Sequence, residues 1–208
     1  MVLDIGRIKR KQKQSETKSR GGFFRCKEGR NVIRVFPFQH KVTKEDVKSG
    51  TFEKELLGKT VTEIDRQVTR FFREGGKPTF FRSESDPLYQ EYAAAKKKGS
   101  KNARRLGPTS HYVMNIVDVE NPEMGIVEFA APKSVYHEII GYVCDPDYGE
   151  DVLGCEGRDF IIEYDASAEG SDKYSVKIRP ESKCEKLPES LEEKVKDMYD
   201  PEVEANLA

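Results

Sequence analysis

The chain has 208 residues, of which 36% are hydrophobic and 35% are charged, and its formal net charge is −1. This composition indicates a soluble, polar protein with one modest core plus extensions, and no apolar run approaches the ~20 residues that a membrane-spanning helix needs. The N-terminus is basic and lacks a hydrophobic secretory segment, so we expect a protein that is not secreted. The four cysteines are scattered without a C-x-x-C pair, which favours reduced thiols.

The charge is divided into blocks of opposite sign. Residues 1–34 hold eleven Lys or Arg against three acidic residues, a local charge of +8, and residues 66–105 hold eleven against four, which is +7. Residues 181–208 hold nine acidic residues against four lysines. Such blocks indicate a basic binding face, with acidic regions that repel the same ligand or bind a partner. A single charged run is usually solvated surface, but two separate basic blocks are harder to explain in that way.

Residues 1–30 form a basic segment with too few apolar side chains for a core, and we expect a partly mobile arm. The arm either contacts nucleic acid or a second copy of the chain, or serves as a disordered tail that aids solubility. The next segment, Asn31 to His40, alternates as a strand with Arg34 and Phe36 on one face. That pair suits a platform on which a base stacks beside a cation. The same pattern equally fits an alternative, in which Phe36 belongs to a core and the aliphatic stem of Arg34 carries its guanidinium group out to solvent.

Residues 66–82 predict a hairpin of two β-prone runs around Gly75 and Gly76, since glycine accepts positive φ. Both runs combine Arg or Lys with paired phenylalanines. On the first run the side chains that alternate onto one face are Arg66, Val68, Arg70 and Phe72. Such a face makes a poor core but suits single-stranded nucleic acid, whose bases are exposed for stacking. The alternative is an ordinary edge hairpin with solvated arginines and buried phenylalanines.

The rest of the chain alternates strands with a few helices. A helix is predicted from Asp86, a good N-cap, to Gly99, and the basic surface continues through Arg104 and Arg105, as phosphate contacts or as solvated charge. Further strands are predicted at 110–119, 126–130, 158–165 and 173–179, with a helix at 132–143. A capping-box pattern at Ser190 predicts a short helix in the acidic C-terminal region. These elements predict a mainly β fold with inserted helices, a small and partly closed barrel.

The motifs of common catalytic sites are absent from the sequence. There is no phosphate-binding G-x-x-x-x-G-K-[ST], no H-E-x-x-H and no G-x-S-x-G. The three histidines have no Cys or carboxylate at metal-ligand spacing, and D-P-D-Y-G-E-D lacks the spacing of a calcium loop. We therefore predict a protein that is not an enzyme and holds no metal. A nuclease is the catalytic alternative, which rests on scattered carboxylates.

An ordered series of segments resembles a known family. The series is N-V-I-R-V-F-P, the basic aromatic hairpin, R-R-L-G-P-T-S-H-Y-V-M-N-I-V-D, A-P-K-S-V-Y-H-E-I-I, D-P-D-Y-G-E-D, G-R-D-F-I-I-E-Y and Y-S-V-K-I-R-P. It is similar to the single-stranded-DNA-binding proteins of tailed bacteriophages, the helix-destabilising replication type of the T-even phages. The resemblance covers about residues 31–180.

The resemblance implies an OB-fold core at 31–180, an OB-fold-like five-stranded barrel with extensions. It implies coating of single-stranded DNA without sequence preference during replication, recombination and repair, in the cytoplasm of an infected bacterium. It also implies self-association through the basic arm at 1–30, and recruitment of replication proteins through the acidic C-terminal tail at 181–208 with its short helix.

One departure from the family concerns zinc. Family members commonly carry a zinc module that ends in C-P-x-C after the basic hairpin, whereas this chain has Asp86-Pro87-Leu88-Tyr89 and no Cys or His from Phe80 to Gly107. Neither an isolated carboxylate nor a tyrosine replaces soft thiolates at neutral pH. We predict that zinc and other cofactors are absent.

The expected mechanism combines two interactions. Lys and Arg neutralise phosphates and release counterions, and aromatic rings stack on bases whatever their identity. The predicted phosphate contacts are Arg66, Arg70, Arg73, Lys77, Arg82, Arg104 and Arg105, and Arg34 is a further predicted DNA contact, as the cation beside a stacked base. The predicted stacking residues are Phe36, Phe72, Phe80, Tyr89 and Tyr112, of which some must instead belong to the core. The alternatives are an OB-type module for single-stranded RNA and a charged adaptor that binds other proteins.

Overall fold

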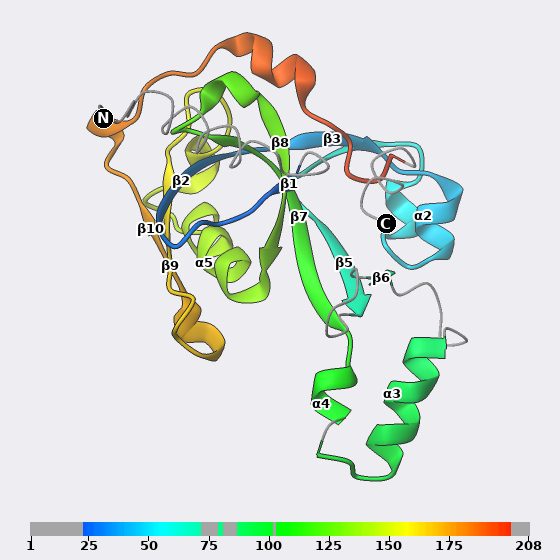
Figure 1. The fold of residues 1–208 in the computed structure, drawn as a ribbon. Coiled ribbons are helices and arrows are strands. Elements are labelled where there is room, and N and C mark those ends of the chain that lie inside the picture. The colour runs from blue at the N-terminus through cyan, green and yellow to red at the C-terminus, as the bar shows by residue number, and fades with distance from the viewer. Residues whose placement is uncertain (1–22, 72–78, 81–86, 102, 201–208) are drawn as a thin grey trace, which may run out of the picture.

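The fold is a mainly β body with a few helices around it (Figure 1). The computed structural model describes residues 23–71, 79–80, 87–101 and 103–200. Within them, no helix is long and apolar enough to cross a membrane. The predicted arm at 1–30 lies outside the described residues up to residue 22, as do the hairpin loop at 72–78 and the chain end at 201–208.

The main sheet contains eight strands, and their hydrogen-bonded order follows β1-β8-β7-β2-β9-β10. Strand β5 pairs with β7 and also with β6. All of these pairings are antiparallel except that between β1 and β8. The bounds are β1 Phe23–Phe24, β2 Gly29–Phe36, β5 Arg66–Phe71, β6 Thr79–Phe80, β7 Thr109–Asp118, β8 Ile126–Pro132, β9 Phe160–Tyr164 and β10 Tyr174–Ile178.

A second sheet pairs β3 (Phe38–Lys41) with β4 (Thr60–Glu63) in antiparallel register. The strand predicted from Asn31 to His40 is thus divided at Pro37 into β2 and β3. Proline has no backbone N–H to donate to a ladder, so a strand commonly breaks or changes sheet there. The mainly β prediction is confirmed. The described strands form an open path, in which β1 and β10 stand at opposite ends, and a closed five-stranded barrel is not shown.

The helices lie at the margins of this sheet. Helix α5 covers the sheet near β10, whereas α3 and α4 extend away from the body next to the end of β5 (Figure 1). The α-helices are α2 Lys44–Lys48, α3 Pro87–Lys97, α4 Ala103–Leu106 and α5 Lys133–Val143. The short 3-10 helices are η1 Lys54–Leu56, η2 Pro122–Met124, η3 Gly149–Val152, η4 Gly170–Lys173, η5 Glu181–Lys183 and η6 Glu189–Lys194.

The main core lies between α5 and the sheet. Val135 and Ile139 are one helical turn apart on α5, and both are buried, as the i, i+4 spacing predicts. They pack with alternate residues of β2 and β7, since every second side chain of a strand points to the same face. The fully buried members of this cluster include Ile33, Val35, Met114, Ile116, Phe160 and Ile162.

The C-terminal region is docked onto the body as far as it is described. Leu187, Leu191 and Met198 are buried, and the backbone of Lys196 exchanges two hydrogen bonds with the side chain of Asn115 on β7. The sequence predicts an acidic tail from residue 181 whose short helix either packs on the domain or detaches from it, and in the structure residues 181–200 pack on the domain and complete two of the apolar clusters. The predicted helix is the 3-10 turn η6, which follows Pro188 without a side-chain cap, so the capping box at Ser190 does not form.

Candidate nucleic-acid interface

Strand β5 brings together predicted site residues that are far apart in the sequence. On one side β5 pairs with β7, where Gln67 faces Tyr112, and on the other it pairs with β6, where Arg70 faces Phe80. The predicted hairpin is confirmed in its described part, since both strands are present and antiparallel. The chain then leads into α3 and α4 (Figure 1). One corner of the molecule thus holds Arg66, Arg70, Phe80 and Tyr112, with the basic α3–α4 extension beside it.

The face of β5 that carries Arg66 packs inward. Val68 is buried in a cluster with Phe38, Val113 and Met198. Arg66 is half-buried and donates a hydrogen bond from Nη1 to the carbonyl oxygen of Met198 at 3.0 Å. Its guanidinium carbon lies 5.1 Å from the ring centroid of Tyr199. The expectation that this alternating face is open to DNA is therefore wrong at Val68, because the C-terminal segment covers it.

Tyr112 lies on the opposite face of the same strand pair. It is half-buried and stacks in parallel on Tyr136 of α5, with ring centroids 3.7 Å apart and planes 2° apart. The two rings line a hollow of about 720 Å³, whose wall also includes Gln67 and Thr69 of β5 and Tyr199. Stacking on Tyr136 holds the ring of Tyr112 in one orientation, so less side-chain entropy is lost when a base stacks on it.

The hollow is acidic. Among the described residues, the carboxylates that line it are Glu45, Asp46, Glu63 and Asp65, and the guanidinium that lines it is that of Arg66. Carboxylates repel phosphates but accept hydrogen bonds from N–H groups, including those of bases. Within the described residues, this hollow therefore favours a base edge over the sugar-phosphate backbone. The backbone of a bound strand fits better on the cationic side of the corner.

Asp65 is the most perturbed carboxyl group of the hollow. Burial raises the pKa of Asp65 from 3.8 to about 6, the charge of Glu63 adds to the rise, and a hydrogen bond from Tyr136 opposes it. For the same reason, burial beside Asp65 raises the pKa of the Tyr136 hydroxyl above its ordinary value. Since the folded-state pKa of Asp65 exceeds its unfolded value, the folded protein binds the proton more tightly, and Asp65 makes stability fall as pH rises from about 4 through 6.

Replacing Tyr136 with Phe is expected to raise the pKa of Asp65 further, because the ring stays but the donor that stabilises the carboxylate is lost. Carboxyl ¹³C NMR across pH 3–8 measures this value. Tyr142→Phe, on the same helix and likewise half-buried, is the matched control and should leave Asp65 unchanged. An Asp65 that titrates near 3.8 in the unmodified protein would contradict the assigned burial.

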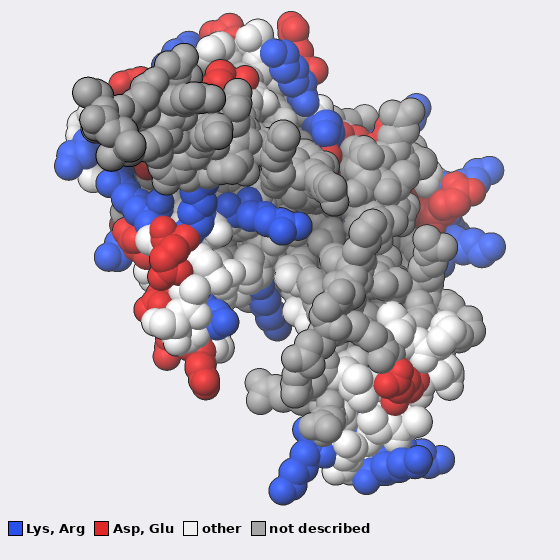
Figure 2. Space-filling model, viewed as in Figure 1, with Lys and Arg blue, Asp and Glu red and all other residues white. Residues whose placement is uncertain are grey.

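The cationic side of the corner is the α3–α4 extension. Lys96, Lys97, Lys98 and Lys101 are all exposed, and Figure 2 shows Lys and Arg gathered at the outer end of this extension. The lysines follow from the last turn of α3, where the helix dipole favours cations. Tyr89 is half-buried on α3 and contacts Tyr92 edge to face, with centroids 6.1 Å apart. The predicted helix and its basic end are confirmed, and Tyr89 faces a neighbouring ring of its own helix.

Two residues that were predicted to contact DNA, Arg34 and Phe36, lie inside the protein, so these two predictions are wrong. Arg34 is 0% exposed and is held by Asp159, with N–O distances of 2.9 and 2.6 Å from Nε and Nη2. Its Nη1 donates to the carbonyl oxygens of Cys155 and Glu185. Phe36 is also 0% exposed and packs with Val117, Cys155, Leu187 and Leu191. Neither side chain can reach a strand of DNA on the surface.

Several predicted contacts fall outside what the structure describes. The residues Phe72, Arg73, Lys77 and Arg82 lie outside the described ranges. For Arg70, Phe80, Arg104 and Arg105 the backbone is described but the side chain is not. Their strand and helix positions place them at the corner defined above. Whether their side chains contact DNA therefore stays a prediction.

In the described part of the chain, no group of three or more His, Cys, Asp or Glu is arranged to hold a metal ion. The predicted absence of zinc stays a prediction. A larger hollow of about 870 Å³, lined by Arg158, Arg179 and neighbouring residues up to Lys186, includes none of the predicted site residues.

Asp65, Tyr136 and Tyr199 were not among the candidates that the sequence indicates. Asp65 is one of many carboxylates, and Tyr136 belongs to the predicted core helix. Tyr199 lies in the acidic region from residue 181, whose composition predicts a tail. No local pattern marks these residues, because each reaches the hollow through contacts with distant parts of the chain.

Comparison of the chain with protein-family models, and with curated proteins, finds no match.

Proposed function

We propose that this protein binds single-stranded DNA without marked sequence preference and has no catalytic role. The observation that carries the proposal is the pairing of β5 with both β6 and β7. This pairing brings the stacked ring of Tyr112, the strand positions of Arg66 and Arg70 and the lysine-rich α3–α4 extension to one corner. Bases then stack at Tyr112, and the phosphates follow the cationic side, away from the carboxylates of the hollow. Duplex DNA hides the faces of its bases, so binding favours the single strand.

We also propose that the sheet is an OB-type barrel of the kind found in phage helix-destabilising proteins. Two features support this proposal. Strand β2 pairs with β9 through its first half and with β7 through its second half. Helix α5 lies between β8 and β9 in the chain and packs under the sheet. Coating of DNA during phage replication, recombination and repair, with self-association through the basic arm and replication partners at the C-terminus, belongs to the same proposal.

The experiment is a titration of the protein with dT oligomers, with the matched duplex and with the matched RNA, at several salt concentrations. The expected result is tighter binding to dT than to duplex, with a log–log salt slope of about −0.7 per phosphate contact. Equal affinity for DNA and RNA would make the protein a general single-strand module. Equal affinity for duplex and single strand would contradict the proposal.

Replacing Tyr112 with Ala is expected to weaken dT binding by about 1–3 kcal/mol, the range found for one stacked base. Tyr174→Ala is the matched control, because Tyr174 is also a half-buried tyrosine stacked on a second one, Tyr164, at 4.9 Å. It lies on β10, at an end of the sheet path away from β5. Equal losses for the two variants would exclude Tyr112 as a specific stacking contact.

A further inference from the structure

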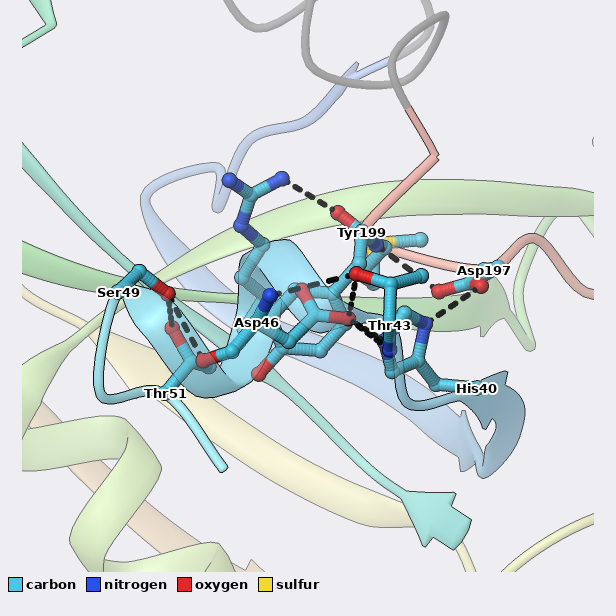
Figure 3. A network of polar contacts seen from close by, with 9 residues as sticks. His40, Thr43, Asp46, Ser49, Thr51, Asp197 and Tyr199 are labelled. Atoms are coloured by element: carbon cyan, nitrogen blue, oxygen red, sulfur yellow. Dashed lines mark hydrogen bonds and ion pairs between the residues drawn. The ribbon is translucent and has the colours of Figure 1, made fainter. Parts of the chain in front are cut away.

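His40 sits between two carboxylates that come from distant parts of the chain (Figure 3). It lies on β3 and is 5% exposed. Its Nδ1 is 2.8 Å from Oδ2 of Asp197, and its Nε2 is 3.0 Å from Oδ2 of Asp46. An ionised carboxylate only accepts hydrogen bonds, so a histidine that bonds to one through each ring nitrogen carries a proton on both. The geometry thus defines an imidazolium ion.

The surroundings of His40 reinforce the charged form. Asp46 also accepts hydrogen bonds from the backbone N–H and the hydroxyl of Thr43, which fix its carboxylate at the start of α2 (Figure 3). Glu63, on the adjacent strand β4, adds negative charge. The ring is flanked by Phe52 and Tyr199, with centroids 5.4 and 4.5 Å away. Arg66 is a nearby cation, and its guanidinium lies over the ring of Tyr199, which also packs against His40.

The sum of these contacts determines the direction in which the pKa of His40 shifts. Burial lowers the pKa of His40, but the hydrogen bonds and charges of Asp197 and Asp46 outweigh it and raise the pKa above 6.5. Burial tends to raise the pKa of Asp46, and the bonds from Thr43 and His40 outweigh it, so this pKa is lowered. The ion pair therefore persists from the lowered pKa of Asp46 up to the raised pKa of His40. It is lost as pH rises through the latter.

The C-terminal segment is attached at two separable points. Lys196 is held to Asn115 on β7 through its backbone, and its Nζ lies 2.8 Å from Glu128 of β8. Beyond Lys196, the polar contacts include those of Asp197 with His40 and of the Met198 carbonyl with Arg66. In addition, the side chain of Met198 is fully buried with Phe38, Val68 and Val113, and the ring of Tyr199 packs against His40 and Phe52. Loss of the His40 contact thus removes one attachment of residues 197–200, while the segment up to Lys196 keeps its own anchor.

We propose that protonated His40 is a clamp that holds residues 197–200 against the hollow, and that its deprotonation loosens them. Loosening weakens the contact between the Met198 carbonyl and Arg66, and it lets the ring of Tyr199 move out of the wall of the hollow. The clamp is a property of the free protein. Its effect on DNA rests on the proposed function.

The test follows His40 and the segment in the same sample of the full chain. The probes are the imidazole Cε1–H signal and the ¹³C-methyl signal of Met198, with Met114 of the sheet core as internal reference, between pH 5.5 and 9. Both signals should titrate with one midpoint above 6.5, while Met114 stays constant. Amide exchange of residues 197–200, corrected for the intrinsic rate, should rise up to about tenfold per pH unit between 6.5 and that midpoint.

Three variants make the result specific. His40→Gln and Asp197→Asn should each abolish the pH response of Met198 and leave residues 197–200 in fast exchange at every pH. Glu193→Gln, which removes an exposed carboxylate of the same segment, should behave like the unmodified protein. A His40 that titrates while Met198 and the exchange of 197–200 do not respond would overturn the clamp. So would a midpoint at or below 6.5.

Binding of dT oligomers separates the two proposals. The unmodified protein should bind more tightly as pH rises through the His40 midpoint, and Asp197→Asn should lack this increase. If no single-stranded DNA binds at any pH, the proposed function fails, and the NMR and exchange data still decide the clamp. If DNA binds with the same pH dependence in both proteins, control of Arg66 by the clamp is refuted.

Discussion

Replacing Arg34 with Ala is expected to lower the free energy of unfolding by about 3–5 kcal/mol, the range for removing one partner of a buried ion pair. The side chains of Arg34 and Asp159 are 1% and 0% exposed. Without Arg34, Asp159 keeps its bond to Arg179 at 3.0 Å, but the carbonyl oxygens of Cys155 and Glu185 lose their donor. Glu185 belongs to the docked C-terminal region, so that region should loosen as well.

Urea unfolding measures the change through the transition midpoint at an unchanged slope. The matched control is Arg158→Ala, which breaks a 2.8 Å ion pair with Glu181 whose side chains are 25% and 79% exposed. Exposed pairs contribute about 0–1 kcal/mol, so the control should change little. Where the Arg34 variant is folded, it should still bind dT oligomers, since Arg34 is internal. A small loss of stability with a large loss of DNA binding would restore Arg34 as a surface contact.

Replacing Lys96, Lys97, Lys98 and Lys101 together with Gln is expected to weaken dT binding and to reduce the magnitude of the salt slope by up to ~3, at about 0.7 per lost phosphate contact. All four are exposed at the end of the α3–α4 extension. Gln has nearly the helix propensity of Lys, so α3 should persist. Titration with dT oligomers between 50 and 300 mM salt gives the slope.

A charge-matched control keeps this experiment specific. Lys41, Lys48, Lys54 and Lys59 are also exposed, but lie around α2 and the β3–β4 pair, beside the acidic hollow. Changing these four to Gln removes the same net charge away from the proposed path of the phosphates. If both quadruple variants reduce the slope equally, the binding is a general charge effect and the α3–α4 extension is not a contact surface.

Local patterns in the sequence predicted the elements well. Alternation located β2 and β5, runs of β-prone residues located β7, β9 and β10, and the i, i+4 spacing of Val135 and Ile139 located α5. Pro87 and the lysines after it located α3. These signals depend on neighbours within a few residues, and the structure keeps them because the core is built from the same faces. The division at Pro37 also follows from local chemistry.

The faces of those elements were harder to predict. Whether Arg34 points to solvent depends on Asp159, 125 residues away, and whether Val68 is covered depends on Met198. An alternating pattern defines two faces but does not say which one meets the rest of the chain. The acidic composition after residue 180 indicates a tail, yet Leu187, Leu191 and Met198 are buried there, and hydrogen bonds from Arg34 and Asn115 also hold the region. Tertiary contacts outweighed composition at each of these places.

The most direct test of the central claim is to map where a bound strand lies. Photo-crosslinking of an oligo-dT that carries 5-bromouracil, followed by peptide mass spectrometry, identifies the contacted residues. The account predicts crosslinks at Tyr112 and within residues 66–80 and 87–106, reduced by high salt and by unlabelled dT. Crosslinks confined to β9 and β10, or none under conditions of saturation, would contradict it.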